Sequence, residues 1–321
     1  MPLLDAIRAL SEFDPPGALP PADLAELADV LEAHGLAPLA SYHLEYRSIG
    51  AGLPAQFREK LLSLYQGVVN DNVFKVMTLR SVLKESEVPV VLLGGLAAID
   101  WLYPHLAFRP LGDLRLAVRG SDGARFAEAA RQAGFPATGV EASGAVAHFS
   151  DERVSFAIQE GTYRGADDDP VLFERASCLP AFGPQVYRPS PTDALLATVA
   201  EQAETGLYAP LIGFVDLREL LRLDPPMEPD AVRERARALG LSRALYGSME
   251  LLARFFPSVG ERARALRPEL SHAERAAVEA IVESGSNPAK LTHLRGAEAA
   301  ARAFVAPGRP GGPPAPSPAV I

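Results

Sequence analysis

Val88-Pro89-Val90-Val91-Leu92-Leu93-Gly94-Gly95 sets the expected fold class, and the helical pattern Leu96 to Leu102 follows it directly. The apolar run predicts a buried strand, and the paired glycines predict the turn that ends it. Glycines let a backbone approach a triphosphate closely, and the N-terminus of the next helix offers free N–H groups and a positive dipole end. Strand, glycine pair and helix therefore indicate a phosphate cradle, although a simple strand-to-helix turn gives the same pattern.

A second strand begins beside a carboxylate, because Asp113-Leu114-Arg115 opens the apolar run Leu116-Ala117-Val118. Residues i and i+2 of a strand project from the same face, with Cα atoms roughly 6.6 Å apart. Two carboxylates at this spacing grip Mg²⁺, and two such ions neutralise phosphate oxygens and activate a hydroxyl for transfer of a nucleotide's α-phosphoryl group. The second position here is Arg115, whose guanidinium neither deprotonates nor binds a metal.

The order of these motifs resembles that of the bacterial uncharacterised nucleotidyltransferases of the polymerase-β-like superfamily. The family pattern is a strand with Leu-Lys-Gly, a helix ending near Tyr-Pro, an Arg, an Asp-Ile-Asp leading into a strand, and a helix finishing in Gly-Phe. The matching segments here, in the same order, are Leu93-Gly94-Gly95, Leu102-Tyr103-Pro104, Arg109 to Arg115, and Ala133-Gly134-Phe135. The likeness covers most of the chain, from residue 20 to residue 225.

The resemblance implies a nucleoside triphosphate as substrate or ligand and Mg²⁺ as cofactor. It places Asp113 and Arg115 at the catalytic positions, with Asp113 as the metal ligand, and Gly94, Gly95 and Arg109 at the nucleotide-binding positions. The acceptor is left open between a small molecule, a protein and an RNA end.

Two polar residues of the resemblance have structural alternatives. Arg109 is either a bidentate phosphate clamp or the structural partner of an acid. Asp216 lies in an apolar helical stretch, and its family position suggests a hydrogen bond that locks the helical tail to the core.

Three departures weaken the expected metal site. Gly94 stands where the family has Lys, and Arg115 stands where it has the second Asp. The later strand at 153–158, where a third carboxylate is expected, has none, and Glu152 and Glu160 only flank it. A divalent ion about 5 Å from a guanidinium is disfavoured by roughly 7 kcal/mol at an effective dielectric of about 20.

Two hypotheses of different class follow. The first is an active Mg²⁺-dependent enzyme that uses Asp113 and recruits another acid in space. The second is a degenerate nucleotidyltransferase fold that binds a nucleotide or a protein without chemistry. Arg115 and the carboxylate-free strand favour the second.

The whole chain predicts an α+β protein, with a mixed nucleotidyltransferase-like sheet between a helical lead-in and a C-terminal helical bundle. The expected parts are a lead-in at 1–87, a core at 88–190, a helical domain at 191–305 and a disordered Pro/Gly-rich tail at 306–321. A long helix is expected over 54–85, a hairpin should pair 145–149 with 154–158, and 185–187 should add an edge strand. The expected helices of the C-terminal bundle are 193–203, 211–223, 230–239, 242–256 and 272–283.

Composition limits the partners. A net charge of −9 and a pI near 5.3 argue against a broad nucleic-acid surface, while a local patch for an RNA end stays compatible with them. No signal peptide and no membrane span are expected, which favours a cytoplasmic protein. Cys178 is the single cysteine, so it excludes an internal disulfide and a thiolate metal cluster and is expected to be a buried thiol.

Overall fold

The computed structural model describes residues 2–14, 17–46, 49, 51–140, 146–150, 153–163, 166, 169–286 and 295–307. The chain divides into two compact units. The helical unit comprises Met1–Val68, Ala107–Pro110 and Thr198–Ile321. The α/β unit comprises Val69–Leu106 and Leu111–Ala197. No helix in these described ranges is long and apolar enough to cross a membrane.

The helical unit is held together by apolar helix faces and by side chains that cap helix ends. The Asp23 carboxylate accepts hydrogen bonds from the backbone N–H groups of Ala25 and Glu26, and Ser271 and Glu274 form a capping box. Its described helices are α1 (Pro2–Ser11), α2 (Leu24–Ala33), α3 (Ala37–Tyr46), α9 (Leu211–Arg222), α10 (Pro229–Ala238), α11 (Ser242–Phe255), η3 (Pro257–Val259), α12 (Gly260–Ala265), α13 (His272–Gly285) and α15 (Arg295–Val305). Helices α4 (Ala55–Ser86) and α8 (Pro191–Glu204) contribute residues to both units.

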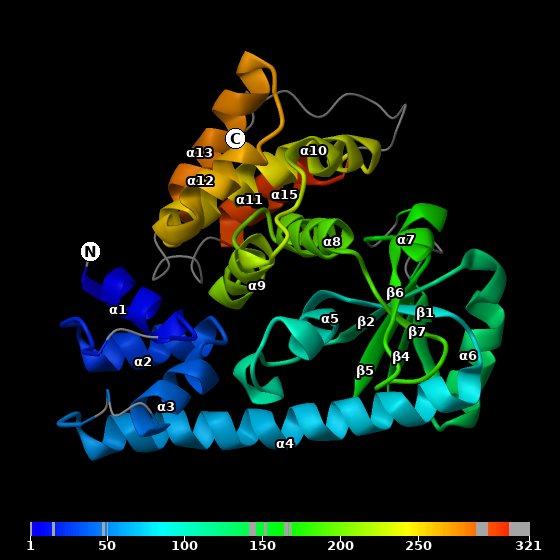
Figure 1. The fold of residues 1–321 in the computed structure, drawn as a ribbon, viewed down its shortest axis with the longest axis horizontal. Helices are drawn as coiled ribbons and strands as arrows, with labels where there is room; N and C mark the ends of the chain where they lie inside the picture. Colours follow the sequence, from blue (N-terminus) through cyan, green and yellow to red (C-terminus); the bar gives the residue numbers. More distant parts are fainter. Residues whose placement is uncertain are drawn as a thin grey trace. The chain divides into compact units, whose positions relative to one another are not determined.

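The α/β unit consists of strands and short helices, with β3, β4 and β5 following one another along the chain (Figure 1). Its elements are β1 (Val90–Leu93), α5 (Gly94–Trp101), β2 (Leu114–Val118), η2 (Gly120–Asp122), α6 (Gly123–Gln132), β3 (Ala137–Val140), β4 (Val146–Ser150), β5 (Ser155–Gln159), α7 (Pro170–Arg175), β6 (Ser177–Cys178) and β7 (Val186–Arg188). A short turn of helix, η1 (Leu106–Phe108), has its first residue in the α/β unit and the rest in the helical unit.

The strands form one mixed seven-stranded sheet in the order β3-β4-β5-β2-β1-β7-β6. Strand β1 is antiparallel to β2 and parallel to β7, and β2 is parallel to β5. The remaining neighbours, β3–β4, β4–β5 and β6–β7, are antiparallel. Because β1 and β2 run in opposite directions, the end of β1 and the start of β2 lie at the same end of the strands. We call this end of the strands the sheet edge; it is distinct from the outer strands β3 and β6.

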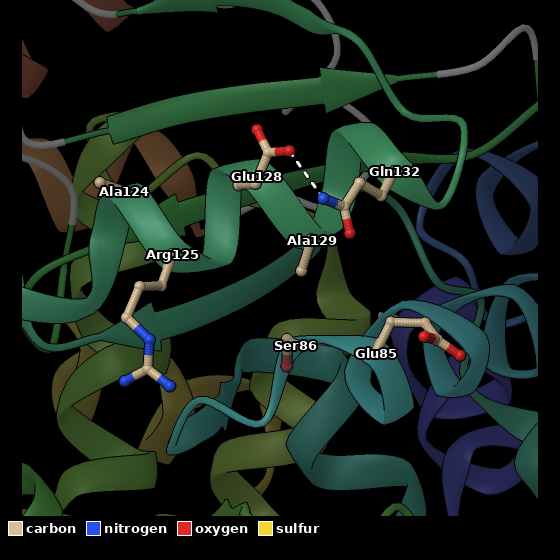
Figure 2. A pocket seen from close by; sticks show the side chains of 7 residues that line it. All are labelled: Glu85, Ser86, Ala124, Arg125, Glu128, Ala129 and Gln132. Atoms are coloured by element: carbon tan, nitrogen blue, oxygen red, sulfur yellow. Dashed lines mark hydrogen bonds between the residues drawn. The ribbon is translucent and has the colours of Figure 1, made fainter.

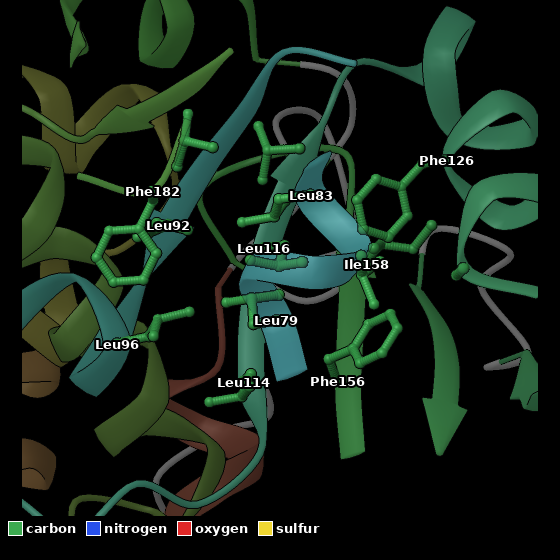
Figure 3. Close-up of a cluster of buried hydrophobic side chains, with 14 of the residues drawn as sticks. Leu79, Leu83, Leu92, Leu96, Leu114, Leu116, Phe126, Phe156, Ile158 and Phe182 are labelled. Carbon is green, nitrogen blue, oxygen red and sulfur yellow. The ribbon is translucent and has the colours of Figure 1, made fainter. Parts of the chain in front are cut away.

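One face of this sheet carries the main apolar core, shown in Figure 3. Alternate strand residues, such as Leu92, Leu116 and Phe156, point into it, because successive side chains of a strand point to opposite faces. Phe126 of α6 and Leu79 of α4 cover the same face. Burial of these side chains stabilises the sheet at roughly 25 cal/mol per Å² of apolar surface removed from water.

The opposite face carries a smaller apolar cluster. Val91 and Leu93 of β1 and Ala117 of β2 pack there with Leu172 and Phe173 of α7. Arg115 lies between Asp113 and Ala117 in the alternation, so it belongs to this second face rather than to the main core.

The structure confirms the expected α+β class and most of the expected core elements. The β4–β5 hairpin forms with Phe149 opposite Phe156, and α4 covers the expected long helix. Two expectations are wrong. Strand β7 is not an outer strand of the sheet, because the two-residue strand β6 pairs with its other side. Cys178 on β6 is exposed rather than buried.

Some expectations fall on parts of the chain that the structure does not describe. They concern residues 145, 151 and 152 of the hairpin and residues 308–321 of the tail. The division of the chain into four consecutive parts stays a prediction.

Candidate functional site

The candidate site lies at the sheet edge where β1 ends and where β2 and β5 begin. Leu93, the last residue of β1, pairs with Arg115 of β2, and Arg115 pairs in turn with Ala157 of β5. The glycine pair after β1 and the Asp113–Arg115 segment are therefore brought together, as the order of the motifs predicts.

Gly94 turns the chain from strand β1 into helix α5. Its φ is +56°, in the left-handed region that favours glycine over residues with a Cβ. Leu93 is the N-cap residue and has extended backbone angles, and no side chain caps this helix end. The first N–H groups of α5 have no intrahelical acceptor, which is the geometry that suits an anion.

Asp113 and Arg115 sit differently on the strand. Asp113 lies just before β2 and is exposed, whereas Arg115 is the second residue of β2 and is half-buried. Both project toward the face that carries the smaller apolar cluster, because they are separated by one residue of extended chain. A carboxylate and a guanidinium thus occupy the two positions that would hold a pair of acids.

Ser155, the first residue of β5, is a neighbour of Asp113 that the sequence does not predict. Its hydroxyl donates a short hydrogen bond to the Asp113 carboxylate. In the parallel β2–β5 register, Leu114 pairs with Phe156, which brings Ser155 alongside Asp113. The third acid expected to face the pair would stand at Ser155 or at Ala157, and neither residue is acidic.

Glu160, which follows β5, does not supply the missing third carboxylate. Glu160 lies beside Gly120, with its carboxyl carbon 3.4 Å from the position that a Cβ on that glycine would take. Gly120 follows the C-terminal end of β2, whereas Asp113 precedes its N-terminal end. Glu160 is therefore at the far end of the strand from Asp113, and Glu152 lies outside the described residues.

These donors do not fit a two-metal site. Mg²⁺ takes oxygen ligands in a near-octahedral arrangement, and the three relevant positions supply one carboxylate, one guanidinium and one hydroxyl that already donates to the carboxylate. Within the part of the chain that the structure describes, no group of three or more His, Cys, Asp and Glu side chains is arranged to hold a metal ion.

Arg109 forms an ion pair with Asp216, and both residues belong to the helical unit. Its Nε and Nη2 donate to the Oδ2 atom of Asp216 at 3.2 and 2.8 Å, and its Nη1 donates to the Pro110 carbonyl at 2.8 Å. The side chains of Arg109 and Asp216 are only 11% and 2% exposed. Of the two roles left open for Arg109, these contacts fit the structural one, and Asp216 is the acid concerned.

An open pocket of about 400 Å³ lies between the end of α4 and helix α6, away from the candidate site (Figure 2). It is lined by Glu85, Ser86, Ala124, Arg125, Glu128, Ala129 and Gln132. The Glu128 carboxylate accepts a hydrogen bond from the Gln132 side-chain amide at 2.7 Å, so the lining is polar and internally paired at this point. None of the lining residues belongs to the candidate site.

Comparison with known proteins identifies the family of the chain. No curated protein and no solved structure matches the chain. A protein family described as uncharacterised nucleotidyltransferase matches residues 20–257, which is well over half of the chain and includes β1, α5, β2 and β5. The chain therefore belongs to this uncharacterised nucleotidyltransferase family.

Proposed function

We propose that the chain binds a nucleoside triphosphate on its α/β unit and that its capacity for nucleotidyl transfer is lost or much weakened. The observation that carries the proposal is the identity of the residues around Asp113. A cation, Arg115, and a hydroxyl, Ser155, stand where the metal-dependent chemistry needs acids. Nucleotide binding and transfer are thereby separated, because binding needs only positive charge and N–H donors.

The ligand set follows from the sheet edge. The backbone at Gly94 and Gly95 and the first N–H groups of α5 would receive phosphate oxygens, as helix N-termini do in other phosphate sites. Arg115 would supply a permanent positive charge on a planar guanidinium, which can donate two hydrogen bonds to phosphate oxygens. Arg109 is left out of this set, because its guanidinium nitrogens already bond to Asp216 and Pro110.

Charge explains the expected loss of transfer. Asp113 and Arg115 together carry a charge near zero, whereas a pair of carboxylates carries about −2 and attracts divalent ions. Without those ions, the developing charge on the phosphoryl oxygens and the attacking hydroxyl are not stabilised in the way that this chemistry uses. We further propose that the protein works in the cytoplasm, where nucleoside triphosphates are available, and that any acceptor is a small molecule, a protein or an RNA end.

Calorimetric titration tests the binding. We expect wild-type protein to bind ATP or GTP in EDTA, with little change when Mg²⁺ is added. Arg115→Ala should weaken binding by about tenfold or more, since a charge-assisted contact contributes more than about 1.4 kcal/mol. Arg125→Ala is the matched control, because Arg125 on α6 is 62% exposed and remote from the sheet edge, and it should leave the affinity unchanged.

A transfer assay tests the loss of chemistry. Wild-type protein incubated with labelled nucleoside triphosphates and Mg²⁺ or Mn²⁺ should label neither itself nor RNA. Robust labelling that Asp113→Ala abolishes would instead establish the active-enzyme alternative. If folded wild-type protein binds no nucleotide in EDTA or in Mg²⁺, the family fold acts here as a protein-interaction module.

A further inference from the structure

The middle of helix α4 holds the loop that leads into the candidate site. Asn72 is fully buried, and its side-chain amide bonds to both ends of that loop. Its Nδ2 donates to the Leu106 carbonyl at 2.7 Å, and its Oδ1 accepts from the Leu111 N–H at 3.1 Å. A single side chain thus bridges backbone groups that lie five residues apart along the loop.

Lys75, one helical turn after Asn72, holds the same loop at a second point. Its Nζ donates to the Leu111 carbonyl at 2.5 Å and pairs with Asp71 at 2.7 Å. The Lys75 side chain is only 13% exposed, although an ammonium normally stays in water. Both backbone groups of Leu111 are therefore bound by side chains of α4.

Leu111 is two residues before Asp113, which makes this anchoring relevant to the site. The Leu111 side chain is buried in the main core, and Leu114 begins strand β2 with full burial. Only Gly112 and Asp113 lie between these two fixed points, and both are exposed. The place of the Asp113 carboxylate is thus determined by β2 on one side and by the α4 contacts on the other.

If position 72 only had to pack in a helix, an apolar residue would give a more stable protein than asparagine. Burying an amide is unfavourable unless its hydrogen bonds are made, and asparagine is a weak helix former. In this helix the amide is satisfied by loop backbone, so its presence is explained by what it holds.

We propose that Asn72 is a positioning residue of the nucleotide site, which sets the Asp113 carboxylate against Ser155 and beside Arg115 by fixing Leu111. Lys75 assists it. The role of this contact in ligand binding rests on the proposed function, whereas the positioning of Asp113 does not.

The experiment compares Asn72→Ala with Asn70→Ala in full-length protein. Asn70 is the matched control, because it is the same residue type on the same helix and is exposed. In ligand-free protein, Asn72→Ala should speed amide hydrogen exchange at Leu111 by about tenfold or more, as expected for the loss of one hydrogen bond. It should also move the amide resonances of Asp113 and Ser155, whereas Asn70→Ala should change neither.

ATP titration supplies the functional readout. At a temperature where both variants are folded by circular dichroism, Asn72→Ala should raise the dissociation constant for ATP by about tenfold, because a shift of the segment before β2 also displaces Arg115, the cation of the proposed phosphate site. Asn70→Ala should match wild type. If Asn72→Ala does not fold, Lys75→Met removes the bond to the Leu111 carbonyl, keeps most of the apolar stem, and should move the same resonances.

The outcomes are distinguishable. Unchanged Asp113 and Ser155 resonances in folded Asn72→Ala, or in Lys75→Met, would overturn the positioning role. Moved resonances with unchanged ATP affinity would leave Asn72 as a loop anchor with no part in binding, and would overturn the proposal. If wild-type protein binds no ATP, the proposed function fails, and the resonances still decide whether Asn72 positions Asp113.

Discussion

The Arg109–Asp216 pair allows a quantitative prediction, because both groups are nearly buried and their contacts are known. Removing the acid with Asp216→Ala leaves a guanidinium that is only 11% exposed and that keeps its hydrogen bond to the Pro110 carbonyl. Breaking one half of a buried ion pair costs about 3–5 kcal/mol. We expect the lower end, about 3 kcal/mol, because the Pro110 bond and some water contact remain.

The assay is urea unfolding followed by circular dichroism, with Arg109→Met, Asp216→Ala and the double variant forming a cycle. The double variant should be less destabilised than the sum of the single variants, because it leaves no buried charge. Glu283→Ala is the control, since Glu283 pairs with Arg254 in the same unit but is 77% exposed, and it should cost only about 0.5 kcal/mol.

Two results would refute this reasoning. A free energy of unfolding that Asp216→Ala leaves unchanged would show that the pair does not stabilise the helical unit. An ATP affinity that Arg109→Met lowers but Asp216→Ala does not would show that Arg109 is a phosphate ligand after all.

Three further predictions concern the sheet edge and the helical unit. The variant Arg115→Asp with Ser155→Asp should bind Mn²⁺ in a calorimetric titration that wild-type protein fails, since it places three acids on one face; equal Mn²⁺ binding by both would contradict it. Gly94→Ala should lower the free energy of unfolding by about 1 kcal/mol, because φ is +56° there, and unchanged denaturation would show that the turn tolerates a Cβ. Burial, and then the hydrogen bond to Glu279, raises the pKa of Tyr246, so the stability it contributes is present below the ordinary phenol pKa and is lost as pH rises through the raised value. Difference absorbance at 295 nm between wild type and Tyr246→Phe reads that ionisation, and a phenol that titrates normally would contradict it.

Elements whose signals are local in the sequence were predictable. The apolar run before Gly94, the helix after it and the strand that follows Asp113 each show their own periodicity and end at their own turn residues. The β4–β5 hairpin was equally readable, because the two strands are neighbours along the chain.

Contacts between distant segments were not predictable in the same way. Ser155 meets Asp113 only because β5 joins β2 in parallel after two intervening strands, and 42 positions separate the two residues. Asn72 carries no motif, and its contacts are with Leu106 and Leu111, which lie 34 and 39 positions later in the chain. The strand β6 escaped notice because two residues are too few to show an alternation.

The alternation of side chains along β2 has an evolutionary consequence. Leu114, Leu116 and Val118 face the main core, while Arg115 faces the other way with Asp113. Selection for a folded protein and selection for chemistry therefore act on interleaved positions of one strand. Residues 113 and 115 can therefore be exchanged without removing a side chain from the main core. Such exchanges would change the charge that this end of the strands presents to a ligand while the main core stays intact.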